Sequence, residues 1–350
     1  MSPAPLPPLI PLPGQPAGVP WPTDEWARAL PGFDPGEHLD PLLDRLFTDG
    51  AADRFGTTNA VLVVRGGQLV VERYGAGVDA GTTLPSWSMA KSILHALVGV
   101  LVGEGRLDLQ AAPAWPGWSA SDDPRSAITL DHLLHMRSGL QWLEDYVDGE
   151  RSNVIEMLFG TGRPDVAAYA AALPLAHPVD TRFCYSSGTS CLVSAATRQV
   201  AGDPAAYEAF MHRALFDPIG MRSPIPKFDA RGTWIGSSYC FSTAEDFARF
   251  GLLYLRDGRW DSTQVLPEGW VDHARTPQPD VDDDGWGYGA HWWLLPDRDD
   301  GLFFASGYRG QYTIVVPRLD LVVVRSGDSE TDQRDAVLGS LLQIVDCFAS

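Results

Sequence analysis

The hydrophobic and polar positions of this sequence predict strands near both ends of the chain and helices between them. Residues 59–64 and 68–74 are apolar, largely β-branched runs that flank a short Arg-Gly-Gly turn, a pattern typical of a β-hairpin. Strand-like runs return late in the chain, at 291–295, 302–305, 312–316 and 321–324. An amphipathic segment at 331–348 is expected to form the last helix. We therefore expect one sheet assembled from both ends of the chain.

Helical periodicity occupies most of the remaining sequence. The apolar residues from Met89 to Leu101 follow a helical pattern, with Ser88 at its entrance and an end near 103–105. Shorter helices are predicted at 130–136, 166–173, 188–200, 204–215, 243–255 and 267–274. Several of them begin near Ser, Asp or Pro, the residues that favour helix N-termini.

These elements predict an α/β fold, in the form of an α+β sandwich with two lobes. Residues 23–105 and 276–350 are expected to form an α/β lobe around the sheet, and residues 106–275 a mostly helical lobe inserted between them. We expect the active site in the cleft between the lobes, where small-molecule sites commonly lie. Residues 1–22 are a Pro-rich arm, expected to be extended on the surface or disordered.

Composition narrows the class of partner. The 350 residues include 45 acidic and 26 basic side chains, for a formal net charge of −19. Nucleic acids and anionic membrane surfaces require clustered Lys and Arg, so we expect neither as a partner. The proline-rich start lacks the pattern of a signal peptide, and no stretch approaches the roughly 20 apolar residues of a membrane span. Four scattered cysteines favour reduced thiols. We expect a cytoplasmic monomer or homodimer.

The run Ser88-Met89-Ala90-Lys91 opens the first long predicted helix and has the spacing of a nucleophile and its base. Residues three apart lie on one helical face, so the Lys91 amine can point back at the Ser88 hydroxyl. The backbone N–H of Ser88, free at a helix N-terminus, is a natural half of an oxyanion hole. Taken alone, the four residues fit a capping serine and a solvated lysine better than a catalytic pair. Apolar neighbours on both sides of Lys91 favour a buried lysine, which needs a partner or a function.

Four further segments extend this pattern. The five together are 87–92 (WSMAKS), 133–142 (LLHMRSGLQW), 183–188 (FCYSSG), 247–253 (FARFGLL) and 305–311 (ASGYRGQ). Jointly they resemble the serine β-lactamase and penicillin-binding-protein superfamily, and within it the class C-like branch that includes 6-aminohexanoate-dimer hydrolases and related esterases. The resemblance runs from about residue 59 to the C-terminus. It implies a β-lactamase/transpeptidase-like fold, with a mixed, mostly antiparallel sheet flanked by helices and an inserted helical lobe.

The resemblance also implies roles for residues of the second motif, Tyr-x-Asn or Tyr-x-Ser, which is Tyr185-Ser186-Ser187 here. Tyr185 is expected to share the Ser88 proton with Lys91 and to return a proton to the leaving group. Ser187 is expected in the substrate-binding set. A core tyrosine with a satisfied hydroxyl is the alternative for Tyr185.

The third motif departs from the family pattern. Where family lactamases and transpeptidases carry Lys-Thr-Gly, this chain has Ala305-Ser306-Gly307, without the lysine that helps to hold a substrate carboxylate. The backbone N–H of Ser306 is expected to complete the oxyanion hole, since that role needs no side chain. Arg309 could replace the lysine as an anion clamp, although an exposed loop arginine is an equal alternative.

The remaining candidates line the expected substrate site. Tyr146 resembles the loop tyrosine that caps the site in the dimer-hydrolase branch, with an ordinary packing aromatic as the alternative. Gly307 and Tyr308 complete the expected substrate-binding residues. Asp280, Asp282 and Asp284 imitate the start of a calcium loop but lack its final glutamate, and the histidines show no metal-binding spacing. We expect neither a metal nor an organic cofactor.

The predicted function is therefore serine hydrolysis of small amides or esters through an acyl-enzyme. Two alternatives stay open: β-lactamase or DD-peptidase activity on the same fold, and a binding module whose catalytic residues are vestigial.

Overall fold

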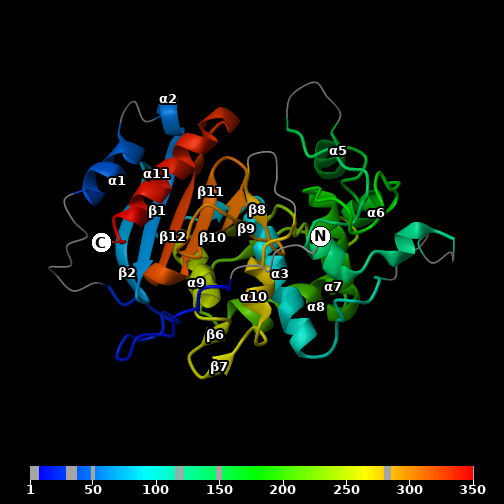
Figure 1. Ribbon diagram of the computed structural model, residues 1–350, viewed down its shortest axis with the longest axis horizontal. Coiled ribbons are helices and arrows are strands. Elements are labelled where there is room, and N and C mark those ends of the chain that lie inside the picture. Colours follow the sequence, from blue (N-terminus) through cyan, green and yellow to red (C-terminus); the bar gives the residue numbers. More distant parts are fainter. Residues whose placement is uncertain are drawn as a thin grey trace.

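One antiparallel sheet joins strands from the two ends of the chain, as the sequence predicts. The computed structural model describes residues 8–28, 38–48, 52–113, 115, 118, 122–146, 152–279 and 285–349. The sheet has seven strands in the order β2-β1-β12-β11-β10-β9-β8 (Figure 1). Their bounds are β1 Thr57–Arg65, β2 Gln68–Tyr74, β8 Gly287–Tyr288, β9 Trp293–Leu294, β10 Phe303–Gly307, β11 Gln311–Val316 and β12 Leu321–Asp328.

Helices cover both faces of this sheet, which explains why its central strands contain continuous apolar runs such as 60–64 and 321–324. In β1, Leu62 and Val64 pack into one core cluster while Val61 and Val63 pack into another, and all four are fully buried. The first cluster is closed by α9 (Ala244–Leu255), and the second by α1 (Leu39–Phe47) and α11 (Arg334–Asp346) (Figure 1). A strand buried on both faces reads as a continuous hydrophobic run.

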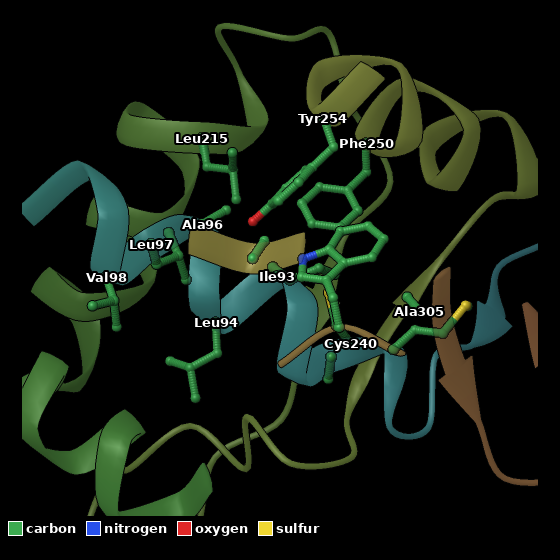
Figure 2. Packing of buried hydrophobic residues seen from close by; sticks show 14 of the residues in the cluster. Ile93, Leu94, Ala96, Leu97, Val98, Leu215, Cys240, Phe250, Tyr254 and Ala305 are labelled. Carbon is green, nitrogen blue, oxygen red and sulfur yellow. The ribbon is translucent and has the colours of Figure 1, made fainter. Parts of the chain in front are cut away.

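The remaining helices group around α3 (Met89–Gly103) and α7 (Ser187–Ala201). They are α4 Leu130–Leu134, α5 Asn153–Phe159, α6 Val166–Ala171, α8 Pro204–Met211 and α10 Trp270–Arg275. Every α3 residue from Met89 to Leu101 is buried. Figure 2 shows its apolar side chains surrounded by residues of other segments, among them Leu215, Phe250 and Tyr254. A helix that is apolar on all sides belongs inside a core.

Short elements complete the described chain. They are α2 Ala52–Phe55, strands β3 Leu84–Pro85, β4 Ile225–Pro226, β5 Cys240–Ser242, β6 Arg259–Trp260 and β7 Thr263–Gln264, and the helical turns η1 Pro124–Ala127, η2 His212–Phe216, η3 Pro317–Leu319 and η4 Thr331–Gln333. In the described residues, no helix is both long enough and apolar enough to span a bilayer.

Two predicted elements are shorter than the sequence pattern indicates, and backbone conformation explains both. The helix predicted at 130–136 ends at Leu134, since Met136 adopts a left-handed conformation with φ 58°. The strand predicted at 291–295 contracts to β9, because His291 also lies in the left-handed region with φ 57°. Neither turn has a glycine to signal it. The division into two lobes at residues 105 and 275 stays a prediction.

The described part of the Pro-rich arm is extended and held by buried arginines of α9, α10 and the turn after α9. Arg249 donates to the Pro22 carbonyl at 2.8 Å, Arg256 to Gln15 Oε1 at 2.9 Å, and Arg275 to the Ile10 carbonyl at 2.6 Å. Residues 1–7 of the arm lie outside the described residues, as does the acidic run that contains Asp280, Asp282 and Asp284.

Candidate active site

Ser88 occupies the N-cap position of α3, directly after a strained turn. Trp87 has φ 43°, a left-handed conformation, and its ring packs against Tyr239 and Tyr308. Strain of this kind persists only where the surroundings hold it. Ser88 Oγ makes no capping hydrogen bond and instead accepts one from Lys91 Nζ at 3.0 Å. The predicted pairing of Ser88 with Lys91 is therefore present, and the capping alternative is not.

Lys91 is buried, and its partners suit an amine that exchanges a proton with Ser88. Besides Ser88 Oγ, its Nζ contacts Ser187 Oγ at 3.1 Å and the Ser237 carbonyl at 2.9 Å. As an ammonium, Lys91 can donate to all three oxygens. As a neutral amine it has two N–H groups for Ser187 and Ser237, and its lone pair then faces the Ser88 hydroxyl. Both charge states fit without rearrangement.

Glu144 fixes the orientation of Ser187. Its Oε1 accepts from Ser187 Oγ at 2.5 Å and from the Tyr146 hydroxyl at 3.0 Å. Its Oε2 accepts from the Ser187 backbone N–H at 2.8 Å and from Trp142 Nε1 at 2.5 Å. Because the Ser187 proton goes to Glu144, the Ser187 oxygen is left as an acceptor for Lys91. Sequence reasoning missed this carboxylate, whose only signal is its place two residues before Tyr146.

Tyr185 lies beside Lys91 but presents its ring. Lys91 Nζ stands 4.7 Å from the centroid of the Tyr185 ring, a cation–π distance. The same ring packs against Trp293 at 5.1 Å and lines the cleft that contains Ser88. Among the described residues, the Tyr185 hydroxyl has no hydrogen-bond partner. The sharing of the Ser88 proton by Tyr185 therefore stays a prediction.

β10 brings Ser306 to the same cleft as Ser88. A Cβ at Gly307 would stand 2.3 Å from the Ser86 carbonyl, so only glycine allows the strand to approach the chain just before Ser88 so closely. In the described chain, no acceptor takes the Ser88 backbone N–H. This N–H and that of Ser306 are the predicted oxyanion donors, and the close approach at Gly307 is what brings the two segments together.

Arg325 holds the hairpin loop that follows Ser306. Its guanidinium is fully buried and donates to the carbonyls of Gly310, at 2.7 Å, and Thr57, at 3.0 Å. It also donates to Ser329 Oγ at 3.0 Å. Burial lowers the pKa of Arg325 to about 10, which leaves it charged at neutral pH. A buried cation thus ties the β10–β11 turn to β1.

The cleft has a volume of about 530 Å³ and contains most of the predicted substrate residues. Tyr146 and Tyr308 stack across it with ring centroids 4.6 Å apart. Burial and the adjacent Glu144 raise the pKa of Tyr146, so its hydroxyl stays a neutral donor. The lining residues are Ser88, Glu144, Asp145, Tyr146, Tyr185, Trp293, Ser306–Gly310, Tyr312, Ser329–Thr331 and Arg334.

Two predicted substrate residues, Ser187 and Arg309, make contacts other than those expected. Ser187 does not line the cleft and contacts Lys91 and Glu144 behind it. Arg309 does line the cleft, but its Nη1 pairs with Asp328 at 2.5 Å and Glu330 at 3.1 Å. A guanidinium already opposed by two carboxylates is a poor anion clamp, so the geometry does not support that role for Arg309.

His291 packs against the first turn of α3 and forms a hydrogen bond with its backbone. It is fully buried, with Nδ1 at 3.0 Å from the Lys91 carbonyl and Nε2 at 3.2 Å from Ser190 Oγ. Burial, together with the Lys91 charge, lowers the pKa of His291 from 6.5 to about 3. The imidazole is therefore neutral, and its Nδ1–H donates to the Lys91 carbonyl. Sequence periodicity placed this residue in a strand and gave no sign of the contact.

The chain is similar to known proteins in sequence and in fold. The family model described as Beta-lactamase matches residues 43–338. The chain is 26% identical over 313 residues to the 6-aminohexanoate-dimer hydrolase of Paenarthrobacter ureafaciens, covering 83% of this chain and 78% of that protein. Its fold is similar to that of a putative 6-aminohexanoate-dimer hydrolase from Bacillus anthracis, with TM-score 0.73, 21% identity and coverage of 93% and 89% of the two chains. A penicillin-binding protein from Bacillus halodurans matches with TM-score 0.66, 17% identity and coverage of 88% and 100%.

Proposed function

Because this chain belongs to the β-lactamase family of serine hydrolases, we propose that it cleaves small linear amides or esters through an acyl-enzyme on Ser88. The observation that carries the proposal is the buried Lys91 amine. It is hydrogen-bonded to Ser88 Oγ at 3.0 Å and also to Ser187 Oγ and the Ser237 carbonyl. A weak alcohol nucleophile requires such a base within hydrogen-bond reach.

In the first step Ser88 Oγ forms a bond to the substrate carbonyl carbon while its proton passes to Lys91 Nζ. The carbonyl oxygen becomes an oxyanion, which accepts from the backbone N–H groups of Ser88 and Ser306. The bond to the amine or alcohol then breaks, and the leaving group takes a proton from Lys91, relayed by Tyr185. In the second step water attacks the ester carbonyl on Ser88 and gives a proton to Lys91. The bond from that carbon to Ser88 Oγ then breaks, Lys91 returns the proton to Ser88 Oγ, and the acid leaves.

The substrate class follows from the cleft and from the third motif. Ala305 stands where the family lactamases and transpeptidases have a lysine, so the residue that holds the carboxylate of a bicyclic lactam is missing. The cleft instead carries acidic Glu144 and Asp145 among its lining residues, with Arg334 also in its wall. Side chains of both signs suit a linear substrate with polar ends. The activity named for the Paenarthrobacter ureafaciens relative, hydrolysis of the 6-aminohexanoate dimer, is one member of this class.

The proposal is tested with a panel of short-chain p-nitrophenyl esters, the 6-aminohexanoate dimer and a chromogenic cephalosporin. Wild-type protein is expected to turn over an ester or the linear amide, and Ser88→Ala to lose that turnover while staying folded. Ser126→Ala, at an exposed serine of η1, is the matched control and should behave as wild type. Equal turnover by Ser88→Ala would refute Ser88 as the nucleophile.

The two alternatives predict different results in the same panel. Preference for the cephalosporin over every ester and amide would favour β-lactamase or DD-peptidase activity. No turnover of any member and no covalent labelling of Ser88 would favour a vestigial binding module. We also propose a cytoplasmic location, which is supported by four cysteines that are all free thiols.

A further inference from the structure

A cluster of histidines and one aspartate lies outside the substrate cleft, around the second turn of α3. The described part of the chain contains one group of His, Cys, Asp or Glu side chains close enough to share a metal ion: Asp131, His135 and His273. Asp131 comes from α4, His135 follows it, and His273 belongs to α10. None of the three lines the cleft that contains Ser88. The hydrolytic mechanism makes no use of them.

The spacing of the three side chains suits a small divalent cation. One nitrogen of each histidine and one carboxylate oxygen of Asp131 all lie within 4.8 Å of one another. Asp131 Oδ1 stands 2.9 Å from His273 Nε2 and 3.2 Å from His135 Nδ1. Zinc bonds of about 2.0–2.1 Å in tetrahedral geometry place neighbouring ligand atoms about 3.3 Å apart. Metal binding therefore requires His135 Nδ1 to lose its proton and turn away from the Asp131 carbonyl, 3.0 Å away. It also requires the two histidine nitrogens, up to 4.8 Å apart, to approach each other by about 1.5 Å.

A second layer of contacts prepares His273 to act as a ligand. His273 Nδ1 lies 3.1 Å from His95 Nε2, and His95 Nδ1 lies 2.8 Å from the Tyr254 hydroxyl. The Tyr254 hydroxyl can in turn donate to the Ser92 carbonyl at 3.4 Å. Protons arranged in that direction give every N–H and O–H of the chain an acceptor and leave the lone pair of His273 Nε2 for an ion. Without an ion, the opposite arrangement lets the His273 Nε2–H donate to Asp131 Oδ1 at 2.9 Å. Ligand histidines in proteins are commonly held by such outer contacts.

The ligand types of the group also suit a cation. Burial and the neighbouring histidines lower the pKa of His95, so this second-layer ring is neutral. Two imidazoles and one carboxylate form a ligand set that zinc accepts, with a fourth position left for water.

We propose that Asp131, His135 and His273 form a binding site for one divalent transition metal ion of the zinc class. The site joins α4 to α10 and, through His95 and Tyr254, to α3 and α9. It departs from the sequence-based expectation of no metal. Asp131 and His135 share only an i, i+4 spacing, and the third ligand, His273, comes 138 residues after His135. Its role is to fasten the helices around α3, and it supplies no group to Ser88.

The test is a titration of chelator-treated protein with Co²⁺ and Zn²⁺ at a pH above neutrality. Wild-type protein is expected to bind one Co²⁺ per chain with a visible absorption band, to lose that band when Zn²⁺ is added, and to unfold at a higher temperature with Zn²⁺. His273→Gln and Asp131→Asn are expected to weaken binding by at least about tenfold. His212→Gln is the matched control, since His212 also faces an aspartate, Asp217, at 3.7 Å but outside this group.

Two results would overturn the site: wild-type protein without stoichiometric uptake of Co²⁺, or binding by His273→Gln equal to that of wild type. A second measurement needs no variant and covers the case in which one fails to fold. Zn²⁺ should protect His135 and His273, but not His212, from diethyl pyrocarbonate, as mapped by peptide mass. Equal modification with and without Zn²⁺ would also refute the site. Ester hydrolysis by His273→Gln should match wild type, so the metal site and the proposed function are tested separately.

Discussion

Acidification should destabilise this protein through His291, the buried histidine that donates a hydrogen bond to the Lys91 carbonyl. The folded state holds His291 neutral, with a pKa of about 3 against an ordinary value of 6.5. The unfolded chain therefore takes up the proton first as the pH falls. The contribution of His291 to stability is complete above about pH 6.5 and is lost progressively as the pH falls from about 6.5 to about 3.

The magnitude follows from the two pKa values. Each pH unit below 6.5 costs about 1.4 kcal/mol until the folded state also takes up the proton. At pH 4.5 only the unfolded chain is protonated at this residue, so the loss is about 3 kcal/mol relative to pH 7.5. The full shift corresponds to a ceiling of about 5 kcal/mol near pH 3.

The assay compares wild type with His291→Asn. Asparagine tolerates the left-handed conformation that position 291 requires, and its amide can still donate to the Lys91 carbonyl. Urea unfolding followed by fluorescence of the 12 tryptophans gives the free energy of unfolding at pH 7.5 and 4.5. Other titrating groups act on both proteins and cancel in the difference.

Wild type should lose about 3 kcal/mol more than His291→Asn between the two pH values. The variant is expected to start lower at pH 7.5, because a smaller side chain leaves a void beside α3. An equal loss by both proteins would refute the claim that His291 is kept neutral by burial and by Lys91.

Three substitutions test other parts of the account. Lys91→Met should lower kcat for an ester by about 10²–10⁴-fold with little effect on folding by circular dichroism, since the apolar side chain suits a buried site; an unchanged kcat would rule Lys91 out as the base. Glu144→Gln should lower kcat about ten- to hundredfold with KM less affected, because Ser187 loses a charged acceptor; steady-state kinetics decide it, and an unchanged kcat contradicts the role of Glu144 in orienting Ser187. Arg325→Met should cost roughly 2–4 kcal/mol in urea unfolding, because the Gly310 and Thr57 carbonyls lose their donor; a neutral effect would show that these carbonyls find other partners.

Local periodicity was enough to predict the parts of the fold with a strong repeating pattern. The hairpin of β1 and β2, the long helix α3 and the return of strands β10 to β12 all follow from runs of apolar residues. The short helix α1 was missed, although Leu39, Leu43 and Leu46 form its buried face, since only nine residues carry the pattern. Such a segment offers little periodic signal to separate it from a loop.

The site could be predicted only as far as its residues share short motifs. Ser88 and Lys91 lie three residues apart, so their pairing is local. The contacts that hold the Lys91 amine are not local: Ser187 is 96 residues away, and the Ser237 carbonyl 146 residues away. A backbone carbonyl leaves no trace in residue identity, and Glu144 stands in an ordinary acidic run. These partners depend on tertiary packing, which the spacing of residue types does not encode.

The central claim is that Ser88 is a nucleophile activated by Lys91, and covalent labelling tests it most directly. The protein is incubated with a fluorophosphonate and examined by intact mass and then by peptide mapping. The account predicts a single adduct on the peptide that contains Ser88, no adduct in Ser88→Ala, and much slower labelling of Lys91→Met. An adduct at another residue, or an unlabelled wild-type protein, would contradict it.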